Sequence, residues 1–260
     1  MTPALTALIL TYNEEANICR TLDALAWVAQ IVVIDSGSSD ATLTLLQHYP
    51  QVCVLQRPFD SFAAQTNFGL AQIQTPWVLS LDADHRVSAA LAGEIQSAIA
   101  SAPPDLIGLA IPFRYCIGGQ PLRGSLLPPR VSLYRPEAGR YVDDGHAHRV
   151  QLRGRIGRLR HPLLHDDRKP LSRWLQAQSR YLPQEASKLL NSPSNQLSTP
   201  DRIRKHTPLA PLLVPLLCLI RHGGLLDGWR GWFYAGQRLY AELLLALLLV
   251  EARRLARQDC

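Results

Sequence analysis

The first hundred residues alternate short apolar runs with amphipathic stretches. The apolar runs predict buried strands over residues 5–10, 30–34, 52–55 and 77–81. Apolar residues at helical spacing predict a helix after Asn13, its expected N-cap, and further helices over 41–48, 61–73 and 88–101. Strands and helices that alternate in this way build βαβ units around a parallel sheet. The expected fold class is therefore α/β.

The rest of the chain has a less regular pattern. It predicts strands over 107–115 and 131–135, an amphipathic helix over 171–190 and a linker over 191–205. Residues 206–260 contain two apolar segments, Pro208–Ile220 and Leu239–Val250, close to tryptophans and arginines. Each segment is shorter than the roughly 20 apolar residues that a spanning helix needs.

This tail is expected to be a pair of helices lying in a membrane surface, because interfacial aromatic residues and flanking arginines are typical of such helices. The alternatives are a helical hairpin that packs on the rest of the protein or on a second subunit, and a transmembrane hairpin.

Polar clusters follow three of the predicted strands. They are Thr11–Glu14, Asp35–Asp40 and Asp82–Asp84. Ligands of open parallel sheets bind at the carboxyl ends of the strands, so these clusters are expected to meet at one site. Asp40 by itself is expected only to cap a loop or helix.

Asp82 and Asp84 form the sharpest of these clusters. Two carboxylates at positions i and i+2 of a loop can share one hard divalent cation with a diphosphate. Such a cation would neutralise a departing diphosphate. The expected cofactor is Mg²⁺ or Mn²⁺.

Composition excludes several classes of protein. The chain has 260 residues, of which 47% are hydrophobic and 18% charged, which excludes a disordered or collagen-like protein. Its five cysteines lie far apart without a CxxC pair, which argues against a zinc site or disulfide framework and favours a reducing cytoplasm. The N-terminal residues are expected to be a strand and not a signal peptide.

Charge is distributed unevenly. Residues 1–140 carry a net charge of −3, whereas residues 141–260 carry +9, almost all of it from arginine. No nucleic-acid-binding motif accompanies this charge, so no nucleic-acid partner is expected. Arg153, Arg155, Arg158 and Arg160 are either the exposed face of a strand or a surface for a phosphorylated acceptor or anionic lipid.

Three motifs, taken together, carry a family resemblance. In order and spacing, Leu10–Glu15, Val33–Thr42 and Leu81–Asp84 resemble family 2 glycosyltransferases of the GT-A fold. The resemblance covers residues 4–115 and continues more weakly through Pro129–Arg130, Leu133–Arg135 and Asp143–His146. The segment Gly223–Trp229 is similar to the lipopolysaccharide-core and surface-polysaccharide members.

The resemblance implies a mostly parallel sheet flanked by helices, in a domain over 1–190. Residues 1–105 would bind a nucleotide-sugar, most often a UDP-sugar, and residues 106–190 the acceptor. Thr11, Tyr12 and Glu14 would line the nucleotide pocket, and Asp35 would accept a hydrogen bond from the base or ribose. Asp82 would face the ribose and the metal, and Asp84 would hold the metal on the diphosphate.

The chain departs from the family pattern in one helix. Many relatives carry a basic residue just before the position of Asn67, where this chain has Thr66. Arg57, Arg86 and Arg123 are the candidates to replace that phosphate contact. His165 resembles a histidine that lies near the metal or the product diphosphate in relatives.

An inverting transfer needs a base for the acceptor hydroxyl. Family 2 members use a carboxylate from the second half of the domain, and Asp144 is the expected base, with Asp143 and His146 as alternatives. Asp143-Asp144-Gly145 is also compatible with a plain turn. The stretch His146-Ala147-His148 lacks the glutamate that lipopolysaccharide-core relatives carry nearby.

The sequence thus predicts a metal-dependent glycosyltransferase on the cytoplasmic face of the inner membrane, acting on a lipid-linked or phosphorylated saccharide. A catalytically decayed membrane-associated scaffold is the alternative. A nucleotidyltransferase is less compatible, because it usually carries a glycine-rich basic loop where this chain has Thr11–Glu15.

Overall fold

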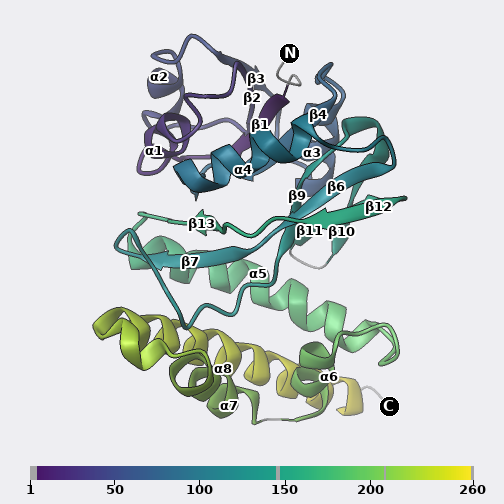
Figure 1. Ribbon diagram of the computed structural model, residues 1–260. Helices are drawn as coiled ribbons and strands as arrows, with labels where there is room; N and C mark the ends of the chain where they lie inside the picture. Colours follow the sequence, from purple (N-terminus) through teal and green to yellow (C-terminus); the bar gives the residue numbers. More distant parts are fainter. Residues whose placement is uncertain (1–4, 145–146, 208, 259–260) are drawn as a thin grey trace. The chain divides into compact units, whose positions relative to one another are not determined.

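The computed structural model describes residues 5–144, 147–207 and 209–258 (Figure 1). The chain forms two compact units. The first contains residues 1–121, 127–143 and 148–168, and the second contains residues 122–126, 144–147 and 169–260. The division expected from the sequence, at residue 190, stays a prediction.

A seven-stranded sheet forms the centre of the first unit. Its order is β12(Arg155–Arg158), β6(Leu106–Ile111), β9(Arg130–Tyr134), β4(Trp77–Asp82), β1(Leu5–Thr11), β2(Gln30–Asp35), β3(Val52–Gln56). All neighbouring strands run parallel except β9, which is antiparallel to both β4 and β6. The predicted α/β class, its mostly parallel sheet and its first four strands are confirmed.

Four helices accompany the strands of this sheet. They are α1(Ile18–Asp23), α2(Thr42–Leu46), α3(Phe62–Leu70) and α4(Ala89–Ala100). Ser61 and Ser88 begin α3 and α4 with side-chain N-caps, which satisfy backbone N–H groups of the first turn. The predicted N-cap Asn13 is wrong, since Asn17 precedes α1 and Asn13 sits in a left-handed turn with a φ of 54°.

Alternating side chains of β1 divide the core between the two faces of the sheet. Ala7 and Ile9 belong to a large cluster that includes α1 and α4, while Leu8 faces a smaller cluster beside α3. Gly69 of α3 lies against Leu8 so closely that a Cβ there would be 2.4 Å from Leu8 Cδ1. The strands are therefore buried on both sides, and their carboxyl ends are held firmly.

Two small sheets complete the first unit. One has the order β5(His85–Arg86), β13(Leu163–His165), β7(Phe113–Ile117), β8(Gln120–Pro121). The other pairs β10(Gly139–Asp144) with β11(Ala147–Leu152). The strand predicted over 107–115 is divided at Pro112, which separates β6 from β7. In the first small sheet, β13 pairs His165 directly with His85.

The second unit is helical in its described residues. It contains α5(Leu171–Asn191), α6(Thr199–His206), α7(Ala210–Leu216), a π-helical turn η2(Leu217–Arg221), a 3₁₀ turn η3(Gly224–Asp227) and α8(Trp229–Gln258). The predicted helix over 171–190 is confirmed, and α6 lies inside the stretch expected to be a linker. The second apolar segment of the tail belongs to the 30-residue α8. By length and composition Trp229–Leu255 is long and apolar enough to cross a membrane, although 33% of its most apolar window is buried inside the protein.

Candidate active site

The three predicted clusters meet at one edge of the large sheet. Thr11 at the end of β1 pairs with Asp35 at the end of β2, and Leu10 pairs with Asp82 at the end of β4. The strands are parallel, so the loops that follow them leave from the same edge. The expectation that these clusters lie together is confirmed.

Asp35 organises the first two loops. Its side chain is fully buried, and its carboxylate accepts hydrogen bonds from Thr11 Oγ1 (2.7 Å), Gly37 N (2.9 Å), Ser38 N (2.8 Å) and Ser38 Oγ (2.6 Å). A buried carboxylate needs such partners, because desolvation without them is costly. Thr11 and Asp35, both predicted to contact the nucleotide, are thus bonded to each other, and their contacts with a ligand stay predictions.

The first loop is tied to the segment that follows β13. Asn17 Nδ2 donates to Glu14 Oε2 (2.9 Å) and to Asp167 Oδ1 (2.8 Å), and the backbone N–H of Arg168 donates to Asn17 Oδ1 (2.8 Å). Tyr12 is 52% exposed at the same edge. Residues about 150 positions apart therefore form one wall of the site.

Asp40 caps the start of α2, as expected from the sequence. Its Oδ1 accepts hydrogen bonds from the backbone N–H and the hydroxyl of Thr42 at the start of α2.

Asp84 lies beside two histidines. Asp84 Oδ1 is 3.2 Å from His165 Nδ1 and 3.8 Å from His85 Nε2, and the three atoms lie within 4.8 Å of one another. Both of these ring nitrogens are buried and have no hydrogen-bond partner of good geometry in the described part of the chain. Buried polar atoms normally have a partner, so a carboxylate and an imidazole held this close fit a divalent cation.

The pKa values of the two histidines are shifted in opposite directions. Burial lowers the pKa of His85 to about 4, although the Asp82 and Asp84 carboxylates act against it. Burial also acts to lower the pKa of His165, but the adjacent Asp84 carboxylate outweighs it and leaves that pKa above its usual value. A proton and a metal ion would therefore compete for the same nitrogen of His165.

Metal binding should weaken in acid for this reason. A cation needs the neutral ring of His165, so Mn²⁺ affinity is expected to fall by about tenfold per pH unit below the pKa of His165 and to level off above it. The sign follows from the raised pKa, since proton and metal compete for the same nitrogen. Calorimetric Mn²⁺ titrations between pH 5.5 and 8 measure this, and a flat profile over that range would show that His165 is not a ligand.

The structure places Arg130 next to Asp82. Arg130 Nη1 is 3.5 Å from Asp82 Oδ2, and its guanidinium lies over the Phe113 ring. Among the three arginines proposed from the sequence to replace the missing phosphate contact, Arg57 binds Asp60 and Gln65, and Arg86 lies 4.0 Å from Asp166. The third, Arg123, belongs to the second unit.

The predicted bases are only partly described. Asp143 is exposed on β10, and its Oδ1 accepts a hydrogen bond from the backbone N–H of Ala63 in the first turn of α3 (3.4 Å). Asp144 ends β10, but its side chain lies outside the described residues, as does His146. The choice among the three stays a prediction.

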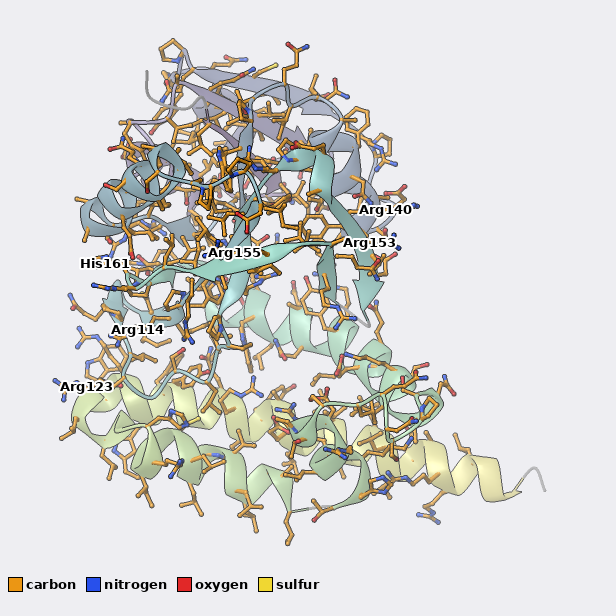
Figure 2. The ribbon with its side chains drawn as sticks, turned by 45° about the vertical axis from the view of Figure 1, so that its right-hand side comes forward. Arg114, Arg123, Arg140, Arg153, Arg155 and His161 are labelled. Atoms are coloured by element: carbon orange, nitrogen blue, oxygen red, sulfur yellow. The ribbon has the colours of Figure 1, made fainter. Side chains whose placement is uncertain are left out.

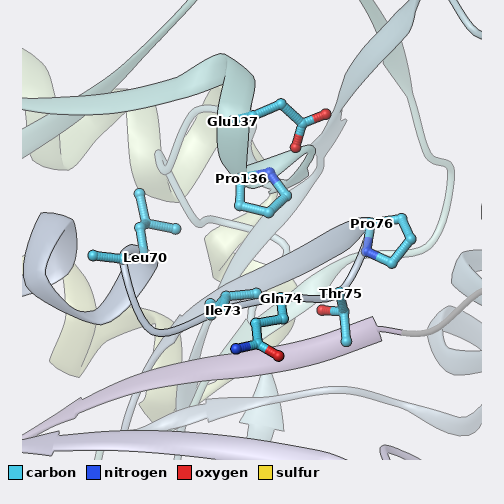
Figure 3. A pocket seen from close by; sticks show the side chains of 8 residues that line it. Leu70, Ile73, Gln74, Thr75, Pro76, Pro136 and Glu137 are labelled. Atoms are coloured by element: carbon cyan, nitrogen blue, oxygen red, sulfur yellow. The ribbon is translucent and has the colours of Figure 1, made fainter.

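Two other surface features lie apart from this group of residues. A shallow pocket of the first unit is lined by the Leu70–Pro76 segment with Pro136 and Glu137, none of which belongs to the predicted site (Figure 3). Exposed arginines such as Arg114, Arg140, Arg153 and Arg155 project from the β-rich segment (Figure 2). Arg155 pairs with the equally exposed Asp105 at 3.3 Å, a contact that contributes little to stability.

Sequence reasoning missed His85 and Arg130 as neighbours of the Asp82–Asp84 loop. His85 directly follows that loop, so its position in the sequence could have predicted it as a neighbour of the two carboxylates. Arg130 follows two prolines almost 50 residues later, and only the antiparallel insertion of β9 beside β4 brings it close.

Comparison with known proteins decides the family. A family model for glycosyl transferase family 2 matches residues 6–155. The chain belongs to glycosyl transferase family 2. It is 34% identical over 119 residues to the lipopolysaccharide core biosynthesis glycosyltransferase LpsC of Rhizobium meliloti, covering 44% of each chain. It is also 30% identical over 106 residues to an uncharacterized glycosyltransferase of Rickettsia bellii, covering 40% of this chain and 36% of that one.

The chain thus spans less than half the length of these curated relatives. Among solved structures, the mannosyltransferase PcManGT of Pyrobaculum calidifontis, in complex with GDP-Man and Mn²⁺, is similar with a TM-score of 0.55. The two share 15% identity over 95% of this chain and 88% of that one. This likeness supports the GT-A-like fold of a family 2 glycosyltransferase.

Proposed function

We propose that this chain transfers a sugar from a nucleotide-diphosphate donor, with a UDP-sugar favoured, to a hydroxyl group of a saccharide acceptor. The observation that carries the proposal is the close approach of Asp84 and His165 at the carboxyl edge of the sheet. Asp84 belongs to the loop that follows β4, and His165 ends β13. Membership of glycosyl transferase family 2 supports the reaction class.

The donor would bind across the loops that Asp35 organises. Thr11, Tyr12 and Glu14 belong to the first of these loops, and the half-exposed ring of Tyr12 is available to stack on a base. Asp82, 41% exposed in its side chain, is open to a ribose hydroxyl. Arg130 beside it supplies a positive charge for the diphosphate.

Asp84 and His165 would hold the cation, with Asp82 facing it. A bound Mg²⁺ or Mn²⁺ would act as a Lewis acid that stabilises the charge of the departing diphosphate. The chain's own residues hold the two ligand atoms 3.2 Å apart. The structure of the similar PcManGT contains Mn²⁺ with its donor, which is consistent with this ion.

Inversion at the anomeric carbon would need one base, for which we propose Asp144, with Asp143 and His146 as alternatives. Asp144→Asn should lower the rate of transfer by about 10²–10⁴-fold and leave metal binding unchanged. Asp143→Asn is the matched control, because that carboxylate is engaged with the first turn of α3. A loss confined to the Asp143 variant would reverse the assignment, and a loss confined to His146→Gln would move it to the histidine.

The acceptor is proposed to be a lipid-linked or phosphorylated saccharide of lipopolysaccharide-core or exopolysaccharide synthesis, at the cytoplasmic face of the inner membrane. Similarity to LpsC over 119 residues and the apolar α8 support this. A decayed scaffold is less well supported, because Asp84 and His165 are present and lie close together.

The direct test is a panel of UDP-, GDP-, dTDP- and ADP-sugars, each with and without Mn²⁺ or Mg²⁺. Release of the nucleoside diphosphate from one donor, dependent on the cation, is the expected result. Well-folded protein that neither binds nor hydrolyses any donor would contradict the proposal.

A further inference from the structure

The second unit carries a continuous apolar face that no described residue of this unit covers. Along α8 the exposed positions recur every three or four residues, as expected for one side of a helix. They include Trp229, Trp232, Leu239, Leu243, Leu247 and Val250, with exposed fractions of 41% to 62%. The neighbouring α7–η3 segment exposes further apolar residues, among them Leu212 (63%), Ile220 (67%) and Leu226 (73%).

We call these residues of α7, η2, η3 and α8 the apolar platform. α7 and α8 lie side by side in the second unit (Figure 1). Soluble proteins rarely expose contiguous apolar patches of this extent, and patches with a polar rim mark an interaction site. The platform therefore needs a partner.

The contacts on the opposite face of α8 argue against a bilayer crossing by this helix. Ala241, Leu245 and Leu249 pack into a leucine cluster with α5. Glu242 beside them is 2% exposed and binds Arg204 of α6 through two guanidinium nitrogens, and Arg238 of α8 at 2.7 Å.

A spanning α8 would carry this ion cluster into hydrocarbon together with the polar α5 and α6. Charged side chains at the centre of a bilayer are strongly unfavourable. A membrane that contacts only the exposed stripe avoids this, because the ion cluster then stays on the side of α8 that faces protein.

Charge favours an anionic lipid surface as the partner. Arg221 follows α7, Arg230 lies over the Trp229 ring, and Arg254 ends the exposed stripe of α8. Of the acidic residues nearby, Asp227 is engaged by the backbone N–H groups of Arg123 and Gly124, and Glu242 by arginines. Glu251 is exposed between Val250 and the basic run that contains Arg253 and Arg254, so arginines outnumber it at that end of the stripe. Tryptophans at one end and arginines at both ends of an apolar stripe are typical of helices in the interfacial layer.

We propose that α7, η3 and α8 form a monotopic platform that lies flat in an anionic membrane surface, with α8 parallel to it. This deepens the proposed function, since it would hold the enzyme beside a lipid-linked acceptor. The membrane platform rests on the proposed function only for its role in the cell, because the binding experiments below do not require transferase activity.

Flotation of the full chain with phosphatidylcholine vesicles, with and without 30 mol% phosphatidylglycerol, tests the platform. Binding is expected to the anionic vesicles and to weaken with salt. The double variant Leu226→Glu/Trp232→Glu should lose at least about tenfold in partitioning, because two exposed apolar contacts are removed. Ile203→Glu, at a 45% exposed position of α6 outside the platform, is the control and should bind like the wild type.

Depth quenching distinguishes a flat helix from a spanning one. The first reporter is Trp232 in a Trp229→Phe variant. The second is a tryptophan placed by Leu247→Trp in a Trp229→Phe/Trp232→Phe background. The two positions lie 15 residues or about 22 Å apart along α8. Equal, shallow quenching by brominated lipids is expected at both positions. Deep quenching at 247 with shallow quenching at 232 would overturn the flat arrangement, as would self-association of the free protein without any vesicle binding.

Cation-dependent donor hydrolysis in solution should be the same in all these variants, so failure of the platform and failure of the proposed function are separate results.

A second inference, carried by a different observation, concerns His85. The backbone N–H of Asp82 donates a hydrogen bond to His85 Nδ1 over 3.0 Å. A nitrogen that accepts a hydrogen bond carries no proton, so the neutral ring holds its proton on Nε2. A protonated Nε2 is a donor and cannot bind an ion.

We infer that His85 is a positioning residue and not a metal ligand, although its Nε2 lies near Asp84. Nε2 lies 3.3 Å from Asp82 Oδ2 and 3.8 Å from Asp84 Oδ1, so its proton faces both carboxylates, although neither contact has hydrogen-bond geometry in the ion-free protein. The ring is 3% exposed in its side chain and packs edge-on against Phe113, which fixes its direction. Partners of this kind orient metal ligands from outside the coordination sphere.

Nitrogen spectroscopy tests the tautomer and the coordination. In histidine-labelled protein, ¹⁵N NMR should show His85 protonated on Nε2, with or without Mg²⁺. Pulsed electron paramagnetic resonance of bound Mn²⁺ should detect one imidazole nitrogen, lost in His165→Ala and retained in His85→Gln. Loss of a second nitrogen signal in His85→Gln, or an Nδ1 proton on His85, would overturn the inference.

Affinity gives an independent readout. His85→Phe, which removes the donor but keeps an aromatic ring, should weaken Mn²⁺ binding by about 10–100-fold, and His85→Gln, which restores an N–H, should recover most of it. Equal losses in both variants would contradict a donor role. If wild-type protein binds no Mn²⁺ at all, the metal site of the proposed function fails, and the NMR result still decides the tautomer.

Discussion

Asp84→Asn should reduce sugar transfer, or donor hydrolysis, by at least about 100-fold while the protein stays folded. The substitution keeps the shape of the side chain but removes the negative charge that a cation needs beside His165. Asp105→Asn is the matched control, because that carboxylate is 63% exposed and pairs only with an exposed arginine. Steady-state release of the nucleoside diphosphate at saturating Mn²⁺ measures the effect.

An Asp84→Asn variant with activity close to that of Asp105→Asn would contradict the assignment of the metal site. The thermal midpoint serves as the folding check. A variant that loses activity because it unfolds would show a lowered midpoint, whereas a lost ligand would leave the midpoint of the ion-free protein near that of the wild type.

Glu242→Gln should destabilise the helical second unit by about 3–5 kcal/mol. This carboxylate accepts hydrogen bonds from Arg204 and Arg238 while it is almost fully buried, so its loss removes the counter-charge that these two guanidinium groups share, and Arg204 keeps only Asp201. Glu251→Gln, exposed on the same helix, is the control and should change stability by less than about 0.5 kcal/mol.

Urea unfolding followed by circular dichroism measures both variants. Equal midpoints for Glu242→Gln and Glu251→Gln would show that the cluster does not hold α6 to α8. The ion cluster around Glu242 would then no longer distinguish a flat α8 from a spanning one.

The strands and their order along the chain could be predicted because each is a short apolar run that ends at a polar cluster. Parallel pairing then places Asp35 and Asp82 at one edge without further information. Helix ends were less predictable, since Asn13 and Asn17 are both plausible caps and only the left-handed backbone at Asn13 decides between them.

The metal group illustrates what a sequence does not contain. Asp84 was predictable from its spacing to Asp82. His165 was expected near the metal only from the family resemblance, because it lies 81 positions away and reaches Asp84 through the pairing of β13 with β5. The role of His85 depends on which ring nitrogen accepts the N–H of Asp82, which no pattern of residues records. In the same way the apolar pattern of α8 is compatible with a core, a span or a surface, and the partners of Glu242 distinguish them.

Equilibrium binding of UDP by calorimetry, with and without Mn²⁺, tests the central claim most directly. The wild-type protein should bind UDP at least about tenfold more tightly with Mn²⁺, and His165→Ala should lose this enhancement while it keeps the weaker, metal-independent binding. UDP binding of equal strength with and without Mn²⁺, or an enhancement that survives in both Asp84→Asn and His165→Ala, would contradict a nucleotide-diphosphate site built on these residues.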